Sequence, residues 1–505
     1  MSAFLNRLRV VVVDREAADE IAALLEKHRL IRVVAAVPVL DAVPEWVTAR
    51  RVDAVVLGEG ATLTAEVRDS LHGDMPEAAL VLMPGKGGQL DPGEYPDAWV
   101  APSEQMDAQL TAVVLASTGC SDGPATINQV GPGLSRSDWI YSQGPLFVVR
   151  GAPEATEMLV HKCMHADFLS IVESSGFHQG FVYEAARASL LSTNGARHRE
   201  YRSVVASYFT RNAAEGLRTP AQSSARALAK TLVGRDQVEF VGEFAAPYIK
   251  NGLFDFFGFS AEEVEPVIWA VDRVAWATKD LSNRRQAATE AAEALYAISR
   301  KAMSRRLGAN VSSPLAAVAE AVEAGRLPEM LGTGLVASML SAGTEPTVNQ
   351  LGIMATELSH CETLWDAMGQ GKQAISPVVE EVLRYRSTNP RIARRVSGNF
   401  VYRGVKFTDG QRVLLDTGAA NRDPRRFPRP EQIDPVVNRG AHLAFGHGPH
   451  FCLGAAVSRV QLQEALAVLT EMFQCPRIVE RVDHKGQGLF GPEKLVVRLR
   501  PRKPV

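Results

Sequence analysis

The stretch from 442 to 454 reads His-Leu-Ala-Phe-Gly-His-Gly-Pro-His-Phe-Cys-Leu-Gly, and it constrains the fold of this chain more than any other segment. It predicts a glycine-rich loop that delivers Cys452 to the first turn of an amphipathic helix. Gly446, Gly448 and Gly454 permit backbone conformations and close approaches that a side chain would block. The free amides and the positive dipole end of a helix N-terminus favour the thiolate form of a cysteine. A thiolate presented in this way suits the iron of a haem, although a cysteine in a turn is often only an inert structural residue.

The first 117 residues alternate short apolar runs with helical patterns. Apolar runs rich in β-branched residues predict strands at 9–14, 31–37, 53–57, 79–83 and 98–100, and a closing helix is predicted at 106–116. Strands that alternate with helices predict a parallel, doubly wound α/β sheet. The segment from 118 to 136 is rich in Gly, Ser and Pro, which is typical of a linker.

From 137 to 505 the pattern is mostly helical. Long amphipathic helices are predicted at 223–233, 285–306, 329–360 and 378–385, and a hairpin-like segment at 400–415. A mostly α unit of this size has a core that can enclose a bulky cofactor.

The composition of the chain excludes several classes of protein. Its formal net charge of −2 argues against a general nucleic-acid-binding surface, which requires a basic excess. No apolar run approaches the roughly 20 residues that span a bilayer, and the N-terminus lacks the apolar segment of a signal peptide. Five scattered cysteines without a Cys-x-x-Cys pair argue against disulfides and zinc. We therefore expect a cytoplasmic protein with reduced thiols and no nucleic-acid or membrane partner.

The cysteine segment resembles the haem-ligand loop of the cytochrome P450 family, Phe-Gly-x-Gly-x-His-x-Cys-x-Gly, at every specified position. The matching residues are Phe445, Gly446, Gly448, His450, Cys452 and Gly454. The resemblance implies a mainly α cytochrome P450 fold with small β elements over 137–505. It also implies that Cys452 binds the iron of heme b (iron protoporphyrin IX), with Phe445, Gly446 and Gly454 beside the cofactor.

A second landmark is the run 380–384, Glu-Glu-Val-Leu-Arg, in which Glu381 and Arg384 share one helical face and can form an ion pair. It looks like the family's Glu-x-x-Arg pair, which ties this helix to the segment before the cysteine loop. The same spacing is common by chance and then gives an exposed pair of little energetic value. Gln432 stands where the family has a further arginine, so we expect a weakened network.

Four basic residues are candidates for the two haem propionates, because buried carboxylates require cationic or hydrogen-bonding partners. His198 and Arg202 lie one helical turn apart, Arg394 follows the Glu-x-x-Arg helix, and His450 lies in the cysteine loop. The resemblance places these four residues on the propionates. Each could instead be a solvated surface charge, and two nearby arginines could replace Arg394.

A long predicted helix carries Ala342, Gly343 and Glu345, which match the family's Ala/Gly-Gly-x-Asp/Glu-Thr segment on the oxygen side of the haem. The small pair lets the helix backbone approach the porphyrin face. Pro346 replaces the expected hydroxyl residue and has no N–H for the Ala342 carbonyl, so we expect a kink. The resemblance implies that the acid and the hydroxyl relay protons. Thr347 could replace that hydroxyl, water on the freed carbonyl could do so, or Thr347 could face away from the site.

The resemblance implies a haem-thiolate monooxygenase of secondary metabolism that oxidises a small apolar or natural-product-like substrate with electrons from a ferredoxin. The candidate substrate-facing positions are Met339, Ala342, Asn389, Pro390 and Ile392. Because Pro346 departs from the family pattern, peroxide use and oxidative rearrangement stay open. A non-catalytic haem-binding sensor or scaffold is the alternative from another class of function.

The strand and helix order of 1–117 resembles a response-regulator receiver. Such a domain needs an acceptor aspartate after its third strand and a lysine before a late proline. Here Gly58 stands in place of the acceptor, and Ala101 precedes Pro102. We therefore expect a degenerate receiver-like domain without phosphotransfer that docks a protein partner. A flavodoxin is disfavoured, because the run 14–18, Asp-Arg-Glu-Ala-Ala, lacks the glycine and hydroxyl residues of a phosphate-binding loop.

Overall fold

The computed structural model describes residues 8–13, 31–37, 54–57, 79–82, 98–99, 139–143, 146–306, 312–438, 440–484 and 489–502. The chain forms two compact units, Met1–Phe147 and Val148–Val505, and each is described by itself. Among the described residues, no helix has the length and apolar character needed to cross a membrane.

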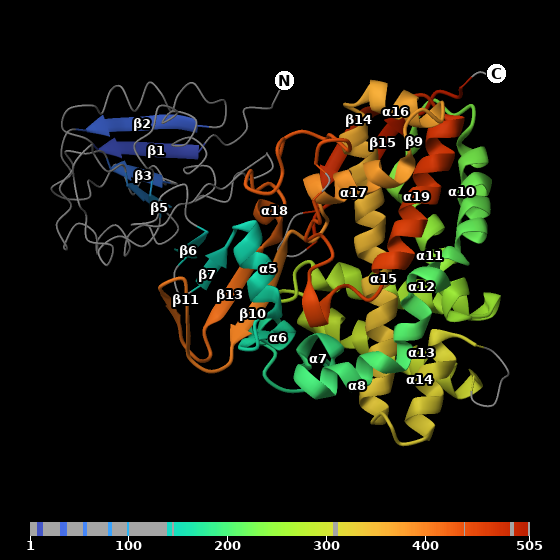
Figure 1. Cartoon of the computed structure of the whole chain (residues 1–505), viewed down its shortest axis with the longest axis horizontal. Coiled ribbons are helices and arrows are strands. Elements are labelled where there is room, and N and C mark those ends of the chain that lie inside the picture. Colours follow the sequence, from blue (N-terminus) through green and yellow to red (C-terminus); the bar gives the residue numbers. More distant parts are fainter. Residues whose placement is uncertain are drawn as a thin grey trace. The chain divides into compact units, whose positions relative to one another are not determined.

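The first unit contains a parallel five-stranded sheet (Figure 1). Its strands are β1 (Leu8–Val13), β2 (Ile31–Val37), β3 (Ala54–Leu57), β4 (Ala79–Leu82) and β5 (Ala98–Trp99), in the spatial order β2-β1-β3-β4-β5. Each strand lies within one residue of its predicted position, and the parallel pairing is as predicted. The predicted helices of this unit, the linker at 118–136, and positions 14–18, 58 and 101–102 lie outside the described residues.

Helices make up most of the second unit, so the mainly α character of the predicted fold is confirmed. They are α5 (Ala152–Val160), α6 (Phe168–Ser174), α7 (Phe181–Ala188), α8 (Gly195–Ala206), α9 (Arg211–Glu215), α10 (Arg218–Leu232), α11 (Ala246–Phe257), α12 (Ala261–Thr278), α13 (Arg285–Arg306), α14 (Pro314–Glu323), α15 (Glu329–Leu358), α16 (Glu362–Gly369), α17 (Ile375–Tyr385), α18 (Thr417–Ala420) and α19 (Ala455–Met472). Shorter turns are the 3-10 helices η1 (Leu190–Ser192), η2 (Ser207–Phe209) and η4 (Gly448–His450) and the π-helical η3 (Val241–Ala245).

The helices predicted for the second unit are all present among its described residues. Helix α13 has the predicted bounds, α15 and α17 differ from theirs by a few residues, and α10 begins about one turn earlier than predicted. Helix boundaries are the part of such a prediction that apolar periodicity constrains least, because the first and last turns make few core contacts.

Small β elements form three further sheets. A five-stranded sheet has the order β6-β7-β13-β10-β8, with β6 (Ile140–Gln143), β7 (Leu146–Val149), β8 (Met164–Ala166), β10 (Arg391–Val396) and β13 (Arg412–Asp416). A three-stranded sheet has the order β14-β15-β9, with β9 (Val238–Glu239), β14 (Arg477–Asp483) and β15 (Pro492–Arg498), and β11 (Phe400–Tyr402) pairs with β12 (Val405–Phe407).

The predicted hairpin at 400–415 is only partly correct. Strand β11 does turn into β12, through Arg403 and Gly404 with φ of 46° and 81°, as a two-residue hairpin turn requires. Strand β13 instead pairs antiparallel with β10. The alternation of apolar and polar residues marks a strand but does not identify its neighbour.

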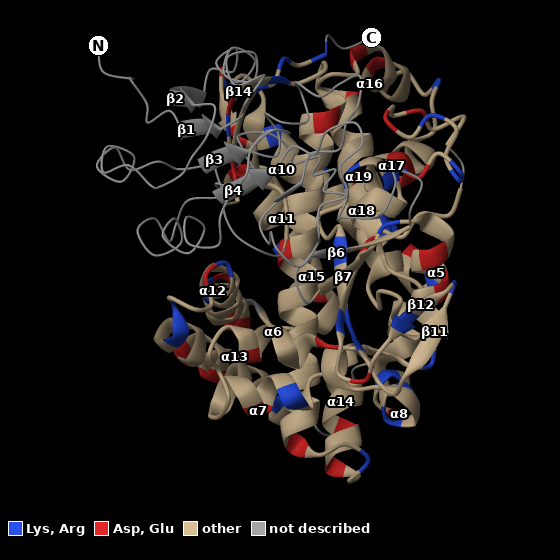
Figure 2. Cartoon of the chain, turned by 90° about the vertical axis from the view of Figure 1, so that its left-hand side faces the viewer, with Lys and Arg blue, Asp and Glu red and all other residues tan. Residues whose placement is uncertain are grey.

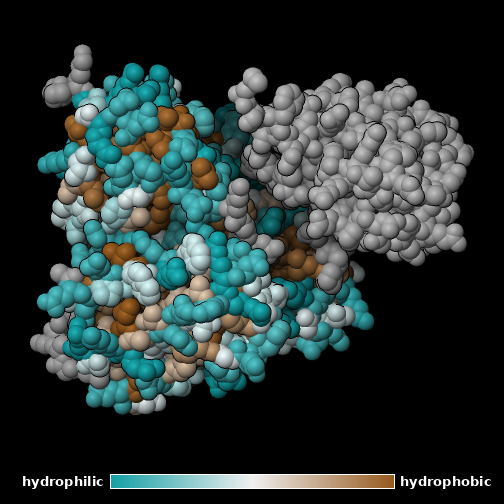
Figure 3. Space-filling model, turned by 180° about the vertical axis from the view of Figure 1, so that it is seen from behind, coloured by the Kyte–Doolittle hydropathy of each residue, from teal (hydrophilic) through white to brown (hydrophobic). Residues whose placement is uncertain are grey.

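Helix α15 is the central column of the second unit (Figure 1). Leu335 and Leu340 in its first half pack in one large apolar cluster, and Leu351 and Met354 in its second half pack in another that includes residues of α19. A helix that is apolar on all sides is typical of a domain interior. Figure 2 shows charged residues on outer helices such as α12, α13 and α14. Hydrophilic residues dominate the face of the second unit that Figure 3 shows, with small apolar patches between them.

Candidate cofactor site

Cys452 lies between η4 and the first turn of α19, where the glycine-rich loop was predicted to deliver it. Gly446 and Gly448 have φ of 70° and 73°, in the left-handed region that favours glycine. A Cβ at Gly448 would lie 2.5 Å from Cγ1 of Val160, so this position also has no room for a side chain. The amide of Cys452 donates a hydrogen bond of 2.9 Å to the Phe445 carbonyl, which closes the loop.

The thiol of Cys452 has a less favourable environment for ionisation than the sequence predicts. Burial raises its pKa and outweighs the lowering by the amides of Gly454 and Ala455 and by Arg202 and Arg459. The residue is nevertheless exposed, so the chain leaves accessible space beside it. A bound metal cation would therefore be needed to hold the thiolate. Gly454 has an ordinary φ of −81°, and no protein atom lies within 4 Å of its Cβ position, so the protein itself does not require glycine there.

Glu380 on α17 supports the cysteine loop from both sides. Its carboxylate accepts hydrogen bonds of 2.7 and 2.9 Å from Arg459 of α19 and lies 3.2 Å from Nε2 of His442. The Arg459 guanidinium in turn lies 4.5 Å from the centre of the Phe445 ring. Burial opposes ionisation, but the two partners lower the pKa of Glu380 to about 2. Sequence reasoning missed Glu380. A signal was available, because adjacent residues on a helix point about 100° apart, so Glu380 and Glu381 must have separate partners.

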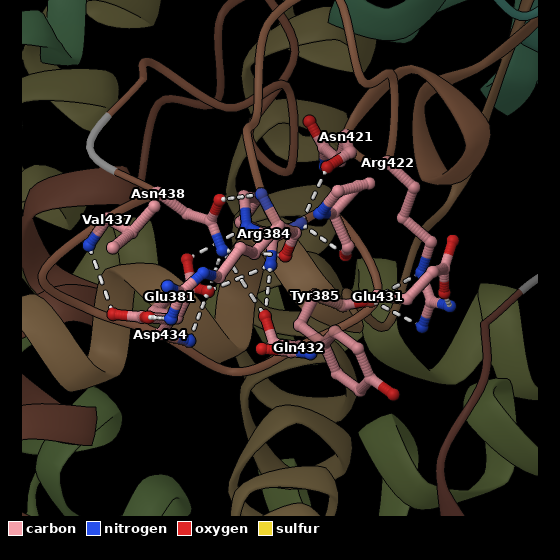
Figure 4. Close-up of polar contacts among 12 residues, drawn as sticks. Glu381, Arg384, Tyr385, Asn421, Arg422, Glu431, Gln432, Asp434, Val437 and Asn438 are labelled. Carbon is pink, nitrogen blue, oxygen red and sulfur yellow. Dashed lines mark hydrogen bonds and ion pairs between the residues drawn. The ribbon is translucent and has the colours of Figure 1, made fainter.

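Glu381 and Arg384 form a buried ion pair, as the resemblance implies (Figure 4). Nε and Nη2 of Arg384 each donate to a carboxylate oxygen of Glu381 at 2.8 Å, and both side chains are 1% exposed. Arg384 also donates to the carbonyls of Asn421, Pro430 and Gln432, each at 2.9 Å. These bonds tie α17 to the segment that precedes the cysteine loop.

A side chain other than that of Gln432 completes the network. Nδ2 of Asn438 donates to Glu381 at 2.9 Å and supplies the third side chain of the network, while Gln432 contributes its main-chain carbonyl (Figure 4). The side chain of Asn421 accepts a hydrogen bond of 2.6 Å from the amide of Leu443, at the start of the cysteine loop. The network reaches the loop largely through main-chain groups, which leave no signature in a sequence.

The four basic residues predicted to bind propionates gather in one place. The ring centres of His198 and His450 lie 4.0 Å apart. Burial lowers the pKa of His450 to about 3, and His198, Arg394 and Arg202 contribute to this shift. Arg394 is 4% exposed, and burial lowers its pKa to about 10. Among the described residues its Nε has no hydrogen-bond partner. Arg202 donates to the carbonyl of Phe451 at 2.7 Å.

This cluster fits the propionates of a haem. Within the described parts of the chain, neither Arg202 nor Arg394 forms an ion pair with a carboxylate, so their charges lack an internal counterion. Buried cations of this kind are stable only beside an anion. A single thiol beside them suits an iron with one thiolate ligand, so the donor set matches haem.

Ala342 and Gly343 on α15 have different surroundings. Ala342 is exposed, although most of the helix around it is buried, so it borders accessible space as Cys452 does. A Cβ at Gly343 would lie 3.0 Å from Cδ2 of Leu253 on α11. Packing against α11 therefore also favours glycine at this position.

Pro346 lies inside α15, and the helix continues past it to Leu358. The preceding residue, Glu345, is half-buried, and burial raises the pKa of its carboxyl. Lys279 lowers that pKa and Asp272 raises it, but burial has the largest influence. Glu345 is therefore an acid that keeps its proton to higher pH than a free glutamate does.

Thr347 has a fixed hydroxyl. Thr347 is 4% exposed, and its Oγ1 donates to the Gly343 carbonyl at 3.2 Å. The same atom lies 3.2 Å from the Ser458 hydroxyl on α19. The side chain of Thr347 is thus directed to the contact between α15 and α19.

The predicted substrate-facing positions differ in exposure. Met339 is 8% exposed, Asn389 is exposed and Pro390 is half-buried. Cδ1 of Ile392 lies 3.5 Å from the Cβ position of Gly446, so Ile392 borders the cysteine loop.

Phe490 is a further candidate that sequence reasoning missed, because it belongs to no motif. Its amide donates to the Thr388 carbonyl at 2.7 Å, and its carbonyl accepts from the Thr388 hydroxyl at 2.8 Å. The Thr388 amide in turn donates to Gln350 of α15 at 2.9 Å. These bonds hold the backbone of Phe490, a residue that is 42% exposed, beside Thr388.

A family model for cytochrome P450 matches residues 375–493, which include α17 and the cysteine loop. Luteothin monooxygenase from Streptomyces thioluteus is 29% identical over 364 residues, which cover 70% of this chain and 88% of that protein. Cytochrome P450 107B1 from Saccharopolyspora erythraea is 30% identical over 316 residues, which cover 61% of this chain and 76% of that protein.

Solved structures match the chain over a similar share of its length. P450BioI, in complex with an acyl carrier protein ligated to hexadec-9Z-enoic acid, aligns with a TM-score of 0.66 over 72% of this chain and 94% of that one, at 23% identity. CalO2 aligns with a TM-score of 0.67 over 72% of this chain and 94% of that one, at 21% identity. At these identities the likeness shows the fold.

Proposed function

The chain belongs to the cytochrome P450 family, and from this premise we propose that it is a haem-thiolate monooxygenase of secondary metabolism. The observation that carries the proposal is the position of Cys452. Cys452 is exposed and lies beside a cluster of basic residues, of which Arg202 and Arg394 form no ion pair with a carboxylate in the described part of the chain. A glycine-rich loop and two glutamates of α17 hold the segment that carries it.

In this proposal Cys452 binds the iron of heme b, and His198, Arg202, Arg394 and His450 bind the propionates. When bound, heme b would supply the activation of oxygen, and a thiolate ligand favours cleavage of the O–O bond. Phe445, Gly446 and Gly454 would lie beside the cofactor. The unhindered Cβ position of Gly454 supports this, because only a group outside the chain would require glycine there.

Insertion of one oxygen atom into a C–H bond releases the other as water, so two electrons and two protons must reach the site. Glu345 is the group that would hold a proton beside Ala342, because burial raises the pKa of its carboxyl. Pro346 has no hydroxyl to pass that proton on, and the hydroxyl of Thr347 already donates to the Gly343 carbonyl.

The substrate would be a small apolar or natural-product-like molecule. Relatives of the chain include luteothin monooxygenase and mycinamicin IV hydroxylase/epoxidase. In this chain Met339, Ala342, Asn389 and Ile392 would face the substrate, and the exposed ring of Phe490 would add an aromatic wall.

A ferredoxin would supply the electrons. Val160 and Phe451 beside the cysteine loop are 50% and 37% exposed, and the arginines at 197 and 199 on α8 are exposed. A small apolar patch with basic residues around it suits a transient, acidic electron carrier.

The first unit would be a receiver-like docking domain over 1–117, joined by the linker 118–136 to a haem domain over 137–505. The strand order β2-β1-β3-β4-β5 supports this, because doubly wound domains of that type share it. A cytoplasmic location is part of the same proposal, since the four described cysteines are free.

Peroxide use is a second candidate, and Pro346 is the observation that favours it. A peroxide brings both oxygen atoms already reduced, so the reaction needs no external electrons and fewer proton transfers. A chain that keeps the acid, Glu345, but has Pro346 in place of the usual hydroxyl residue would be less impaired in that reaction than in one driven by oxygen.

Turnover distinguishes these functions. The full chain is loaded with heme b and given compounds that shift its absorption spectrum, with oxygen and a surrogate ferredoxin and reductase, or with hydrogen peroxide alone. A product heavier by one oxygen atom in the first condition supports the monooxygenase, and a product only in the second supports peroxide use. No product in either condition from any such compound would contradict both and leave a haem-binding sensor.

A further inference from the structure

We propose that Thr347 and Ser458 form a hydroxyl bridge that fixes the spacing between α15 and α19, so that Thr347 is a positioning residue for the cofactor site. The inference rests on the proposed binding of haem by Cys452. It assigns a role to Ser458, which no motif in the sequence identifies, and a role other than proton transfer to Thr347.

The direction of the bridge follows from the count of protons. A threonine hydroxyl has one proton, and Oγ1 of Thr347 donates it to the Gly343 carbonyl at 3.2 Å. The Ser458 hydroxyl must then be the donor in its contact of 3.2 Å with the same Oγ1. The result is a chain of two hydrogen bonds that runs from α19 through Thr347 to the backbone of α15.

The bridge lies next to the proline of α15, where the helix lacks one backbone hydrogen bond. Pro346 has no N–H, so the carbonyl four residues before it loses its helical partner. Thr347 follows directly, and its contact with Ser458 joins α15 to another helix at that point. Within α15, the hydroxyl of Thr347 bonds to the carbonyl of Gly343, the residue after the one whose carbonyl Pro346 leaves free.

The same contact relates the two sides of the proposed cofactor site. Ala342 precedes Thr347 by five residues on α15, and Cys452 precedes Ser458 by six residues at the start of α19. A change in the distance between the two helices at the bridge would therefore alter the spacing between the oxygen-side segment and the cysteine ligand. Active-site geometry that is held by such supporting contacts loses function when they are removed.

Thr344 provides a matched control on the same helix. It is 2% exposed, and its hydroxyl donates at 2.7 Å to the Leu340 carbonyl, one turn earlier. This is the same bond within a helix that Thr347 makes to Gly343. If Thr347 served only as an ordinary helical threonine, removing either hydroxyl would have the same effect.

The test uses the full chain loaded with heme b, reduced and bound to carbon monoxide. It measures the rate at which the absorption band that reports thiolate ligation is lost in dilute urea. Thr347→Val and Ser458→Ala should each speed the loss of that band by about two- to tenfold, the value of one hydrogen bond. The double variant should lose it no faster than the faster single variant, because both substitutions break one bridge. Thr347→Ser should behave as the wild type, and Thr344→Val should change the rate by less than about twofold.

An equal effect of Thr344→Val, or full additivity in the double variant, would overturn the bridge. A second measurement separates this inference from the proposed function. Thr347→Val, Ser458→Ala and the double variant are also unfolded in urea without haem, where the effects of the two single substitutions should again be non-additive. If the wild type never shows the thiolate band but this coupling is present, the proposed function fails and the bridge stands. If the coupling is absent there, the bridge fails.

Discussion

Arg384 donates two hydrogen bonds of 2.8 Å to Glu381, in a site where both side chains are 1% exposed. Glu184 and Arg187 have the same Glu-x-x-Arg spacing and also form an ion pair, but Arg187 is 64% and Glu184 45% exposed. The two pairs are indistinguishable by spacing and differ in burial, which decides their energetic value.

Glu381→Gln should therefore destabilise the chain by about 3 to 5 kcal/mol, because it leaves the buried Arg384 without its counterion. Glu184→Gln should change the free energy of unfolding by less than about 1 kcal/mol. Urea unfolding, followed by helical circular dichroism, measures both. Equal losses in the two variants would contradict a special role for the buried pair.

Glu380 should make the stability of the second unit sensitive to acid. Its pKa is lowered from 4.5 to about 2, so its contribution is fully present above pH 4.5 and is lost as the pH falls through about 2. Because the side chain is 35% exposed, solvent screening reduces the contribution to about 1 to 2 kcal/mol. Glu380→Gln should lose this amount at pH 7 and converge with the wild type near pH 2.

Unfolding in urea across this pH range measures the difference. Glu471 is a control, since it pairs with Arg226 on the surface and is 58% exposed, and Glu471→Gln should cost less. A deficit for Glu380→Gln that stays constant from pH 7 to about 2 would show that the carboxylate charge is not its cause.

Two glycines of the cysteine segment should respond differently to alanine. Gly448→Ala should cost about 1 to 3 kcal/mol in the haem-free chain, because φ is 73° and Val160 occupies the Cβ position. Gly454→Ala should change that free energy by less than about 0.5 kcal/mol. It should instead weaken haem binding, measured as the rate of haem transfer to an excess of an acceptor apoprotein. If Gly454→Ala retains haem as the wild type does, Gly454 has no part in the cofactor site.

Arg394→Met should have opposite effects on the haem-free and haem-loaded chains. Without haem it removes a buried cation whose pKa is lowered to about 10, so stability should rise by about 1 to 3 kcal/mol. With haem it removes a propionate partner, so haem should dissociate faster by about tenfold. Arg425 is the control, because it pairs with Glu154 and Asp423, and Arg425→Met should only destabilise. A loss of stability in haem-free Arg394→Met would contradict the absence of an internal counterion.

Much of the architecture could be predicted from the sequence, because apolar periodicity and a glycine-rich motif are local signals. The strands of the first unit, helices such as α13 and α15, and the loop that delivers Cys452 lie where these signals place them. The pairing of Glu381 with Arg384 follows from helical spacing, but its burial depends on segments far away in the chain. For the same reason, Asn438 could not be recognised as the residue that completes this network.

The parts that could not be predicted are those set by tertiary contacts. The sequence suggests that glycine at 343 admits a cofactor, and it gives no sign that Leu253 of α11 also lies 3.0 Å from the Cβ position. The cysteine at a helix N-terminus looks like a ready thiolate, yet burial raises its pKa. In both cases the local rule does not include the neighbours that distant segments bring.

The absorption spectrum of the reduced, carbon-monoxide-bound protein tests the central claim most directly. The full chain loaded with haem should show the long-wavelength band of thiolate ligation at about 450 nm. Cys452→Ser should lose that band while its helical circular dichroism is unchanged. A wild-type chain that binds haem without the band, or a serine variant that keeps it, would show that Cys452 does not bind the iron.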